Sequence, residues 1–183
     1  LEDFKGQEDA LRYALCATAP ESKDTDFTWA DFQARNNNEL VAIFGNFINR
    51  VVVLTNKYWE GIVPKCNSLG AYDKEVLEKL KAFPDKISAS IEKYRFREAL
   101  GELMNLARLG NKYLADTEPW KLKKTDEKRT ETIMNISIQI SASLAVLSEP
   151  FMPFSSKKLK GLLKLNNMTW DDAGGIIIND NHK

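Results

Sequence analysis

Two groups of side chains in this sequence have the types and spacing needed to bind another molecule. The first is Asn46 and Arg50, which are four positions apart and therefore share one face of a helix. An asparagine amide offers a donor and an acceptor, and an arginine offers a rigid fork of donors, so the pair can read the edge of a nucleotide base. The same two residues can instead tie neighbouring helices together through ordinary hydrogen bonds, and the pattern leaves both roles open.

The second group surrounds Trp120. This residue follows Pro119, which restricts the local backbone and so limits where the indole points. Three lysines come directly after it, Lys121, Lys123 and Lys124. A flat aromatic ring beside local positive charge is typical of proteins that stack an unpaired base. The alternative is that Trp120 covers the end of a helix bundle and that the lysines are simply solvated.

Signatures of catalysis or metal binding do not occur. The sequence has no glycine-rich phosphate loop and no G-x-S-x-G motif, and its one histidine, His182, lies in a polar tail. Cys16 and Cys66 are fifty positions apart, which predicts neither a disulfide framework nor a metal site. No apolar run is long enough to span a bilayer, and no signal peptide opens the chain. We therefore expect a cytoplasmic protein whose chain holds no catalytic residue and no metal ligand.

Composition limits the kind of nucleic-acid binder that this chain could be. Lysine and arginine number 26, and aspartate and glutamate also number 26, so the net charge is zero. A strongly basic binder that neutralises many phosphates is excluded, and an RNA partner would need a local basic patch. The 183 residues begin at Leu1 and not at methionine, so we expect a piece of a longer protein.

The elements that must position these residues are helices. Apolar residues recur at steps of three and four, and alternating strand patterns are weak. The expected long helices are 28–60, 73–94, 95–117 and 125–148, with short ones at 9–19 and 155–165. The prediction is an all-α fold, an antiparallel bundle of four to five long helices with a short N-terminal helical arm. The low charge of 125–148 after Glu131 marks it as the most buried helix.

Helix ends and domain limits follow from capping residues and prolines. Thr28 or Asp26 is the expected cap of the first long helix and Asp73 of the second, while Pro84 is expected to kink or split the second. Pro119 is expected to close the third helix. The chain then divides into an arm, a bundle domain and a polar tail, at 1–27, 28–175 and 176–183.

Several motifs taken in order resemble one known family. They are DALRYAL (9–15), DTDFTWADFQARNNNEL (24–40), GNFINR (45–50), RFREALGELMNLARLGNKYLADTEPWKLKK (95–124) and EPFMPF (149–154). The series resembles the C-terminal half of methionyl-tRNA synthetases, a class I aminoacyl-tRNA synthetase family. The resemblance implies a helical anticodon-binding domain, entered through the arm 1–27 that follows a catalytic domain. It also implies that Asn46 and Arg50 hydrogen-bond the first anticodon base, the cytosine of CAU, and that Trp120 stacks on it.

The sequence departs from the pattern of the whole family. Nucleotide-binding signatures of the H-I-G-H and K-M-S-K-S type are missing, so the resemblance implies that this chain binds tRNA and that the absent catalytic domain does the chemistry. The parent would be an ATP-dependent methionine–tRNA ligase, with zinc left open as a further cofactor of the parent. The implied partner is methionine tRNA, not DNA or a membrane. Family members often carry a further dimerisation domain, which leaves a homodimeric parent open.

The sequence is also compatible with three other functions, each of which explains less of it. A helical protein–protein interaction module would explain the apolar stripes but gives no reason for Asn46, Arg50 and Trp120 to converge. The anticodon domain of another class I synthetase, for cysteine or a branched aliphatic amino acid, is disfavoured by the P-W element together with N-x-x-x-R. A free-standing helical enzyme is disfavoured because no catalytic group is apparent.

Overall fold

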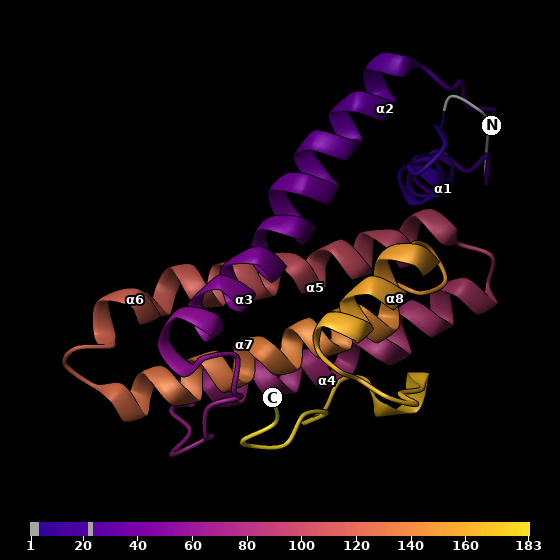
Figure 1. Cartoon of the computed structure of the whole chain (residues 1–183). Helices are drawn as coiled ribbons and strands as arrows, with labels where there is room; N and C mark the ends of the chain where they lie inside the picture. Colours follow the sequence, from indigo (N-terminus) through magenta and orange to yellow (C-terminus); the bar gives the residue numbers. More distant parts are fainter. Residues whose placement is uncertain (1–3, 22–23) are drawn as a thin grey trace.

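The computed structural model describes residues 4–21 and 24–183, and within these ranges the regular elements are all helices. The prediction of an all-α bundle with a short helical arm is confirmed (Figure 1). The α-helices are α1 (Glu8–Ala17), α2 (Trp29–Arg35), α3 (Asn46–Trp59), α4 (Ala71–Glu92), α5 (Phe96–Thr117), α6 (Pro119–Leu122), α7 (Glu127–Leu147) and α8 (Pro153–Leu162). A π-helix, η2 (Asn36–Gly45), and a short 3-10 helix, η3 (Trp170–Asp172), complete the elements.

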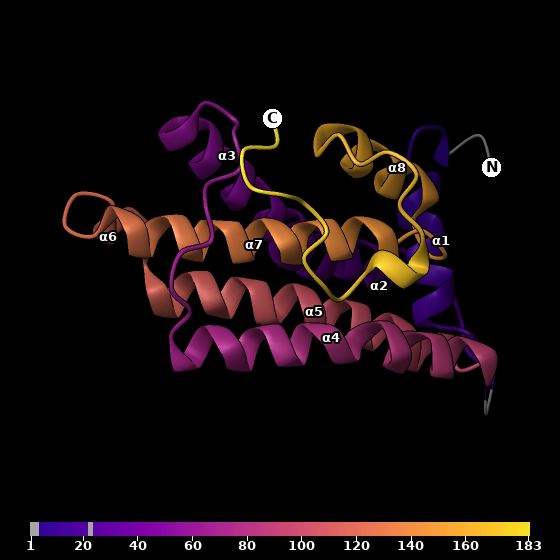
Figure 2. The same cartoon turned by 90° about the horizontal axis from the view of Figure 1, so that it is seen from below.

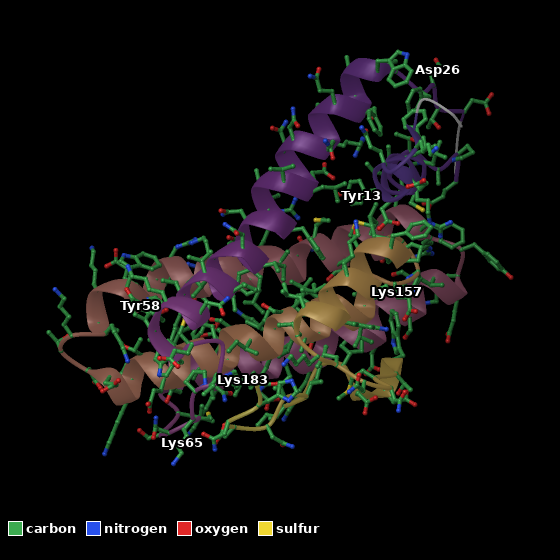
Figure 3. All side chains as sticks on the ribbon, viewed as in Figure 1. Tyr13, Asp26, Tyr58, Lys65, Lys157 and Lys183 are labelled. Carbon is green, nitrogen blue, oxygen red and sulfur yellow. The ribbon has the colours of Figure 1, made fainter. Side chains whose placement is uncertain are left out.

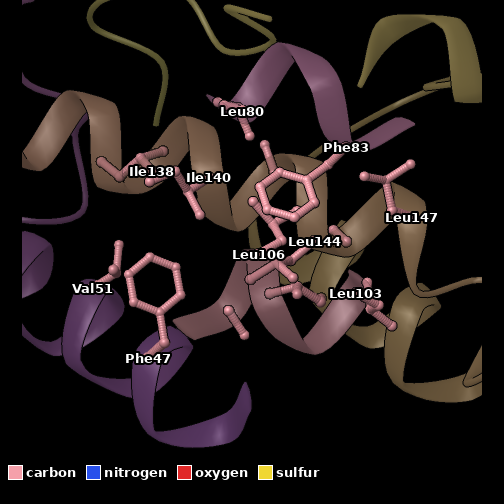
Figure 4. Packing of buried hydrophobic residues seen from close by; sticks show 14 of the residues in the cluster. Phe47, Val51, Leu80, Phe83, Leu103, Leu106, Ile138, Ile140, Leu144 and Leu147 are labelled. Carbon is pink, nitrogen blue, oxygen red and sulfur yellow. The ribbon is translucent and has the colours of Figure 1, made fainter. Parts of the chain in front are cut away.

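The bundle is built around α4, α5 and α7, which lie side by side with α3 and α8 on one face of α7 (Figures 1 and 2). In α7, 17 of the 21 residues are buried, which confirms it as the central helix. Phe47 and Val51 of α3 point toward Ile138 and Ile140 of α7 (Figure 4). Burial of these apolar side chains is the main force that holds the helices together.

One continuous helical rod runs through α2, η2 and α3 (Figure 1). Thr28 caps it, because its hydroxyl accepts the backbone N–H of Asp31 at 3.1 Å. The apolar spacing in the sequence predicts one stripe from Leu40 to Tyr58, yet α2 and η2 contain no fully buried residue, and full burial begins at Phe47. The reason is that the outer part of the rod extends beyond the bundle, where α1 is its neighbour (Figure 1).

Helix α4 differs from its prediction at two positions. It is one continuous helix through Pro84, and it begins after Gly70 with Asp73 in its first turn. Asp73 still satisfies the helix start, since its carboxylate accepts the backbone N–H of Gly70 at 2.8 Å. The predicted cap residue therefore acts from inside the helix as one half of a capping box.

Residues 176–183, predicted as a polar tail, lie against the bundle. Ile178 is buried, and its backbone N–H donates to Oε1 of Gln139 at 2.9 Å while its carbonyl accepts Nε2 of the same residue at 2.7 Å. Asn135, one turn before Gln139, donates to Asp180 at 3.0 Å, and Ser143, one turn after, accepts the N–H of Gly174 at 3.1 Å. The row Asn135, Gln139 and Ser143 thus explains why an otherwise apolar helix carries buried polar groups.

Candidate nucleic-acid interface

The structure brings Arg50 and Trp120 together at one end of the bundle. The guanidinium carbon of Arg50 lies over the indole at 5.0 Å from the ring centroid, although the two residues are 70 positions apart in the sequence. Both side chains are half-buried, so each keeps a surface that another molecule can reach. A guanidinium at this distance is attracted by the aromatic face, which holds the pair together in the free chain.

The short helix α6 sets the direction of Trp120. Helix α5 ends at Thr117, and Glu118 adopts a left-handed conformation with φ of 42° that turns the chain. As predicted, the helix before Pro119 ends just ahead of it, and Pro119 itself occupies the first position of the next helix and is buried. A proline is well suited to that position because its missing N–H would have no helical partner there. The buried Pro119 fixes the turn from which the indole of Trp120 projects.

Asn46 lies at the first position of α3, exposed and one turn before Arg50. Its side-chain nitrogen Nδ2 donates to Oδ1 of Asn111 on α5 at 3.3 Å. Asn111 is itself anchored, since its Nδ2 donates to the carbonyls of Ile43 at 2.9 Å and Ala107 at 3.1 Å. Asn46 therefore does tie two helices together, which was the alternative role considered for it, and it remains an exposed residue.

A second set of aromatic rings lies at the C-terminal end of α3, next to α6. Nζ of Lys123 lies 4.4 Å from the ring centroid of Trp59 and 5.9 Å from that of Tyr58, and Lys57 lies 5.3 Å from Tyr58. Tyr58 marks this end of the bundle in Figure 3. The sequence did not reveal this set because Tyr58 continues the apolar spacing of the expected helix 28–60, whereas in the structure the residue is only half-buried. The detectable signal was two consecutive aromatics beside a lysine at a helix end.

Helices α3 and α5 approach closely behind the interface. A Cβ atom added at Gly110 would lie 2.4 Å from Cζ of Phe47, whose ring is fully buried. Only glycine leaves room for that ring, and Asn111 is the next residue along α5. The close packing of Gly110 and Phe47 therefore fixes the distance between the helices that carry Asn46 and Asn111.

The arm is attached to the far end of the bundle through α8. The carboxylate of Asp9 accepts the backbone N–H groups of Phe154 at 3.3 Å and Ser155 at 2.5 Å, in the first turn of α8. Arg12 donates to the carbonyl of Pro150 at 3.0 Å. Two polar residues of the D-A-L-R-Y motif thus satisfy backbone groups of the E-P-F-M-P-F segment and of the residue that follows it, which attaches the arm to the start of α8.

The last residue of that motif attaches the arm to the rod. The hydroxyl of the buried Tyr13 donates a short hydrogen bond to Glu39 in η2, and Arg35 forms an ion pair with Glu39 at 3.6 Å. Burial, together with the hydrogen bond to Glu39, raises the pKa of Tyr13 above its ordinary value. Tyr13 therefore stays a neutral donor across the physiological range.

The described residues form neither a metal-binding cluster nor a membrane-spanning helix. Across 4–21 and 24–183, no three His, Cys, Asp or Glu side chains gather closely enough to hold a metal ion. None of the helices described combines the length and the apolar character that a membrane span requires. Cys16 and Cys66 are both free thiols.

Comparison with known proteins identifies the family. The family model described as the anticodon binding domain of methionyl tRNA ligase matches residues 63–180, and the model of class I tRNA synthetases (M) matches residues 2–52. The chain is 63% identical to the methionine–tRNA ligase of Cytophaga hutchinsonii over 176 residues, which are 96% of this chain and 26% of the relative. It is 65% identical to that of Flavobacterium psychrophilum over 174 residues, which are 94% of this chain and 25% of the relative.

A solved structure supports the fold. The free-state crystal structure of Mycobacterium tuberculosis methionyl-tRNA synthetase superposes with a TM-score of 0.89 and 23% identity, covering 95% of this chain and 36% of that one. The chain spans about a quarter of the length of the curated relatives that it matches. The match to residues 63–180, with the identities above, shows that the chain belongs to the methionyl-tRNA ligase family and carries the anticodon-binding domain of that family.

Proposed function

We propose that this chain recognises the CAU anticodon of methionine tRNA through Trp120, Asn46 and Arg50. The observation that carries the proposal is the contact between Arg50 and Trp120, 5.0 Å from guanidinium carbon to ring centroid. It joins a flat aromatic ring and a fork of donors at one accessible point of a domain whose family binds anticodons. The boundaries 28–175 for this domain and 1–27 for its arm are part of the proposal.

The first anticodon base stacks on the indole of Trp120. Arg50 covers one face of that ring in the free chain, so a base that stacks there moves the guanidinium aside. Leaving an exposed aromatic face costs about 0.5–1 kcal/mol. Stacking of a base on an aromatic ring contributes about 1–3 kcal/mol, which exceeds that cost. The displaced Arg50 then donates from its fork to acceptors on the edge of the same base, beside Asn46.

The activity of the whole protein is a second part of the proposal. We place this chain in an ATP-dependent methionine–tRNA ligase of the cytoplasm, in which a catalytic domain absent from these residues attaches methionine. The support is the match of residues 2–52 to the class I model and of the chain to about a quarter of the curated ligases. ATP would bind in that other domain, and the residues described here offer no ligand set for zinc.

An exposed aromatic cluster favours contact with that domain. Rings of Phe4 and Trp29 stack at 5.4 Å between centroids, Phe32 lies 5.4 Å from Phe4, and Trp29 is 62% exposed. All three residues fall in the segment that matches the class I model. Exposed apolar patches mark interaction sites, and we propose that this one packs against the catalytic domain. If the chain were instead a helical protein–protein interaction module, this aromatic cluster would bind a protein other than the catalytic domain.

A titration with short RNA hairpins tests the anticodon reading. Tryptophan fluorescence is followed while the chain is titrated with a hairpin carrying a CAU loop, and with one that differs only in its first anticodon base. We expect tighter binding of CAU, and about 5- to 100-fold weaker binding by Trp120→Ala, the equivalent of the stacking energy. Trp170→Ala, which removes a half-buried tryptophan from η3, is the matched control. Equal binding of both hairpins by the native chain would contradict the proposal.

A further inference from the structure

Asn111 can orient its side-chain amide in only one way. Its Nδ2 donates to two backbone carbonyls, those of Ile43 at 2.9 Å and Ala107 at 3.1 Å. A carbonyl oxygen accepts and never donates, so the NH₂ group must face these two atoms and Oδ1 must face away from them. Ile43 belongs to η2, so the π-helical segment that leads into α3 supplies one of the two anchors.

The orientation of Asn111 passes to Asn46. Oδ1 of Asn111 accepts a hydrogen bond from Nδ2 of Asn46 at 3.3 Å. The opposite orientation of Asn46 would place two acceptor oxygens against each other, which is unfavourable. The amide of Asn46 is therefore set with Nδ2 toward α5 and with Oδ1 as the acceptor left for a ligand.

We infer that Asn111 is a positioning residue that makes Asn46 an acceptor and so selects cytosine over uracil at the first anticodon base. The inference rests on the proposed function. Cytosine presents an amine donor followed by two acceptors along its pairing edge, whereas uracil has a carbonyl acceptor where cytosine has the amine. Oδ1 of Asn46 accepts from the amine and repels the carbonyl, while the donors of Arg50 satisfy the remaining cytosine acceptors.

Two measurements on Asn111→Ala in the 183-residue chain test this inference. The first is the ¹⁵N–¹H spectrum of the Asn46 side-chain amide without RNA. The second is the ratio of dissociation constants for hairpins with UAU and CAU loops. Asn105→Ala is the matched control, because Asn105 is an exposed asparagine of α5 whose side chain hydrogen-bonds Glu102 and Arg108 of the same helix. Asn111→Ser, too short to reach Asn46, replaces the alanine variant if thermal melting shows that the latter does not fold.

If the inference holds, the Asn46 amide signals in Asn111→Ala move toward solvent-exposed values. The preference for CAU over UAU also falls by about tenfold, which is the change in affinity expected when one hydrogen bond is lost. A double-mutant cycle adds the requirement that Asn111→Ala changes the ratio no further once Asn46 is alanine. Asn105→Ala leaves signals and ratio unchanged.

The contrary outcomes are separable. Unchanged Asn46 signals in Asn111→Ala would overturn the positioning role whatever the RNA does. Shifted signals with an intact preference for CAU would overturn the specificity role of Asn111. Shifted signals in a chain whose native form has no preference for CAU would confirm the positioning of Asn46 but overturn both its assignment to cytosine and the proposed function.

Discussion

Lys123 and Lys124 are adjacent in the sequence but have different surroundings. Lys123 forms an ion pair with Glu127, lies 4.4 Å from the ring centroid of Trp59 and is 19% exposed at its side chain, whereas Lys124 is exposed. A lysine engaged with a carboxylate and an aromatic face is poorly placed to neutralise a phosphate. At the scale of single residues, counting neighbouring lysines in the sequence therefore overestimates how many of them are available to bind a phosphate.

This difference predicts separate effects of the two lysines. Lys124→Ala should lower the slope of log affinity against log salt by about 0.7 for a single-stranded loop, which is one released counterion. Lys123→Ala should instead lower the melting temperature, because α6 loses its contact with Trp59. Lys81→Ala, exposed on α4, is the control for a change of net charge. A salt effect carried by Lys123 alone would contradict these assignments.

Residue types and spacing were sufficient to single out Asn46, Arg50 and Trp120, because each has an obvious chemical capacity. Their contacts were not predictable, since the distance between Arg50 and Trp120 depends on how α3 and α6 pack. Asn111 shows the limit most clearly. Its amide has the same chemistry as that of Asn105 six positions earlier on the same helix, and only the packing of η2 against α5 gives it the carbonyl of Ile43 as an acceptor besides that of Ala107 on its own helix.

At the scale of elements, Gly110 and Gly101 of α5 form a natural test of helix packing. A Cβ at Gly110 would collide with the buried ring of Phe47, whereas a Cβ at Gly101 would meet nothing within 4 Å. Gly110→Ala should cost about 1–3 kcal/mol of unfolding free energy through overpacking. Gly101→Ala should gain up to about 1 kcal/mol, because alanine is the better helix former.

Chemical denaturation of both variants measures these changes. Gly110→Ala should also weaken binding of the CAU hairpin, because Asn46 and Asn111 move apart when Phe47 shifts. A Gly110→Ala chain as stable as the native one would show that the helices can separate without cost.

A buried ion pair joins α4 to α7 and predicts a dependence of stability on pH. Asp73 is fully buried; it accepts Nη2 of Arg129 at 2.9 Å and the hydroxyl of Tyr113 at 2.6 Å. Burial alone would raise the pKa of Asp73, but these hydrogen bonds and that from Gly70 outweigh it and hold the pKa below the ordinary 3.8. A lowered pKa stabilises the folded state above pH 3.8, and this contribution is lost as the pH falls from 3.8 through the lower folded pKa.

Asp73→Asn tests that contribution. At pH 7 the variant should be less stable by about 3 kcal/mol, because Arg129 keeps a partly buried charge without its partner. The difference from the native chain should shrink once the pH falls below 3.8. Denaturation curves at several pH values for native, Asp73→Asn and the exposed control Glu75→Gln decide the matter. A difference that stays constant with pH would contradict a carboxylate at Asp73.

Helices were predictable from the sequence where their charge content or apolar spacing was sufficient to define them. The buried α7 was found from its low charge, and α5 from its apolar spacing. Pro84 was misleading because a proline costs one hydrogen bond but need not end a helix whose apolar face is buried on both sides of it. The π-helical conformation of η2 was not predictable from the sequence, because over ten residues the wider turn does not produce a recognisable spacing of apolar residues.

At the scale of the whole molecule, the C-terminal residues close the bundle by hydrogen bonding to α7. Gln139→Ala removes an acceptor for the N–H groups of Ile177 at 2.7 Å and Ile178 at 2.9 Å. We expect faster hydrogen exchange at both amides and proteolytic cleavage after residue 173, with the bundle intact. Ser137→Ala is the control, because that buried hydroxyl bonds only to Ile133 of its own helix. Unchanged exchange in Gln139→Ala would mean that apolar contacts alone hold the segment.

The position of this segment could not be predicted from its composition. Residues 176–183 are polar at their end, and polar ends are usually solvated. Their place on the bundle is set by side chains about forty positions earlier, and such long-range pairing leaves no local signal.

The rod of α2, η2 and α3 joins the exposed aromatic cluster near Trp29 to the interface at Arg50. The part of the rod from Trp29 to Asn46 is about 25 Å long at 1.5 Å per residue. A stiff rod acts as a lever, so a tilt of about 5° at Trp29 displaces Asn46 by about 2 Å over that length. Such a displacement would stretch the 3.3 Å hydrogen bond between Asn46 and Asn111 beyond hydrogen-bonding range. A small rotation at the aromatic cluster is therefore mechanically equivalent to making or breaking the contact between Asn46 and Asn111.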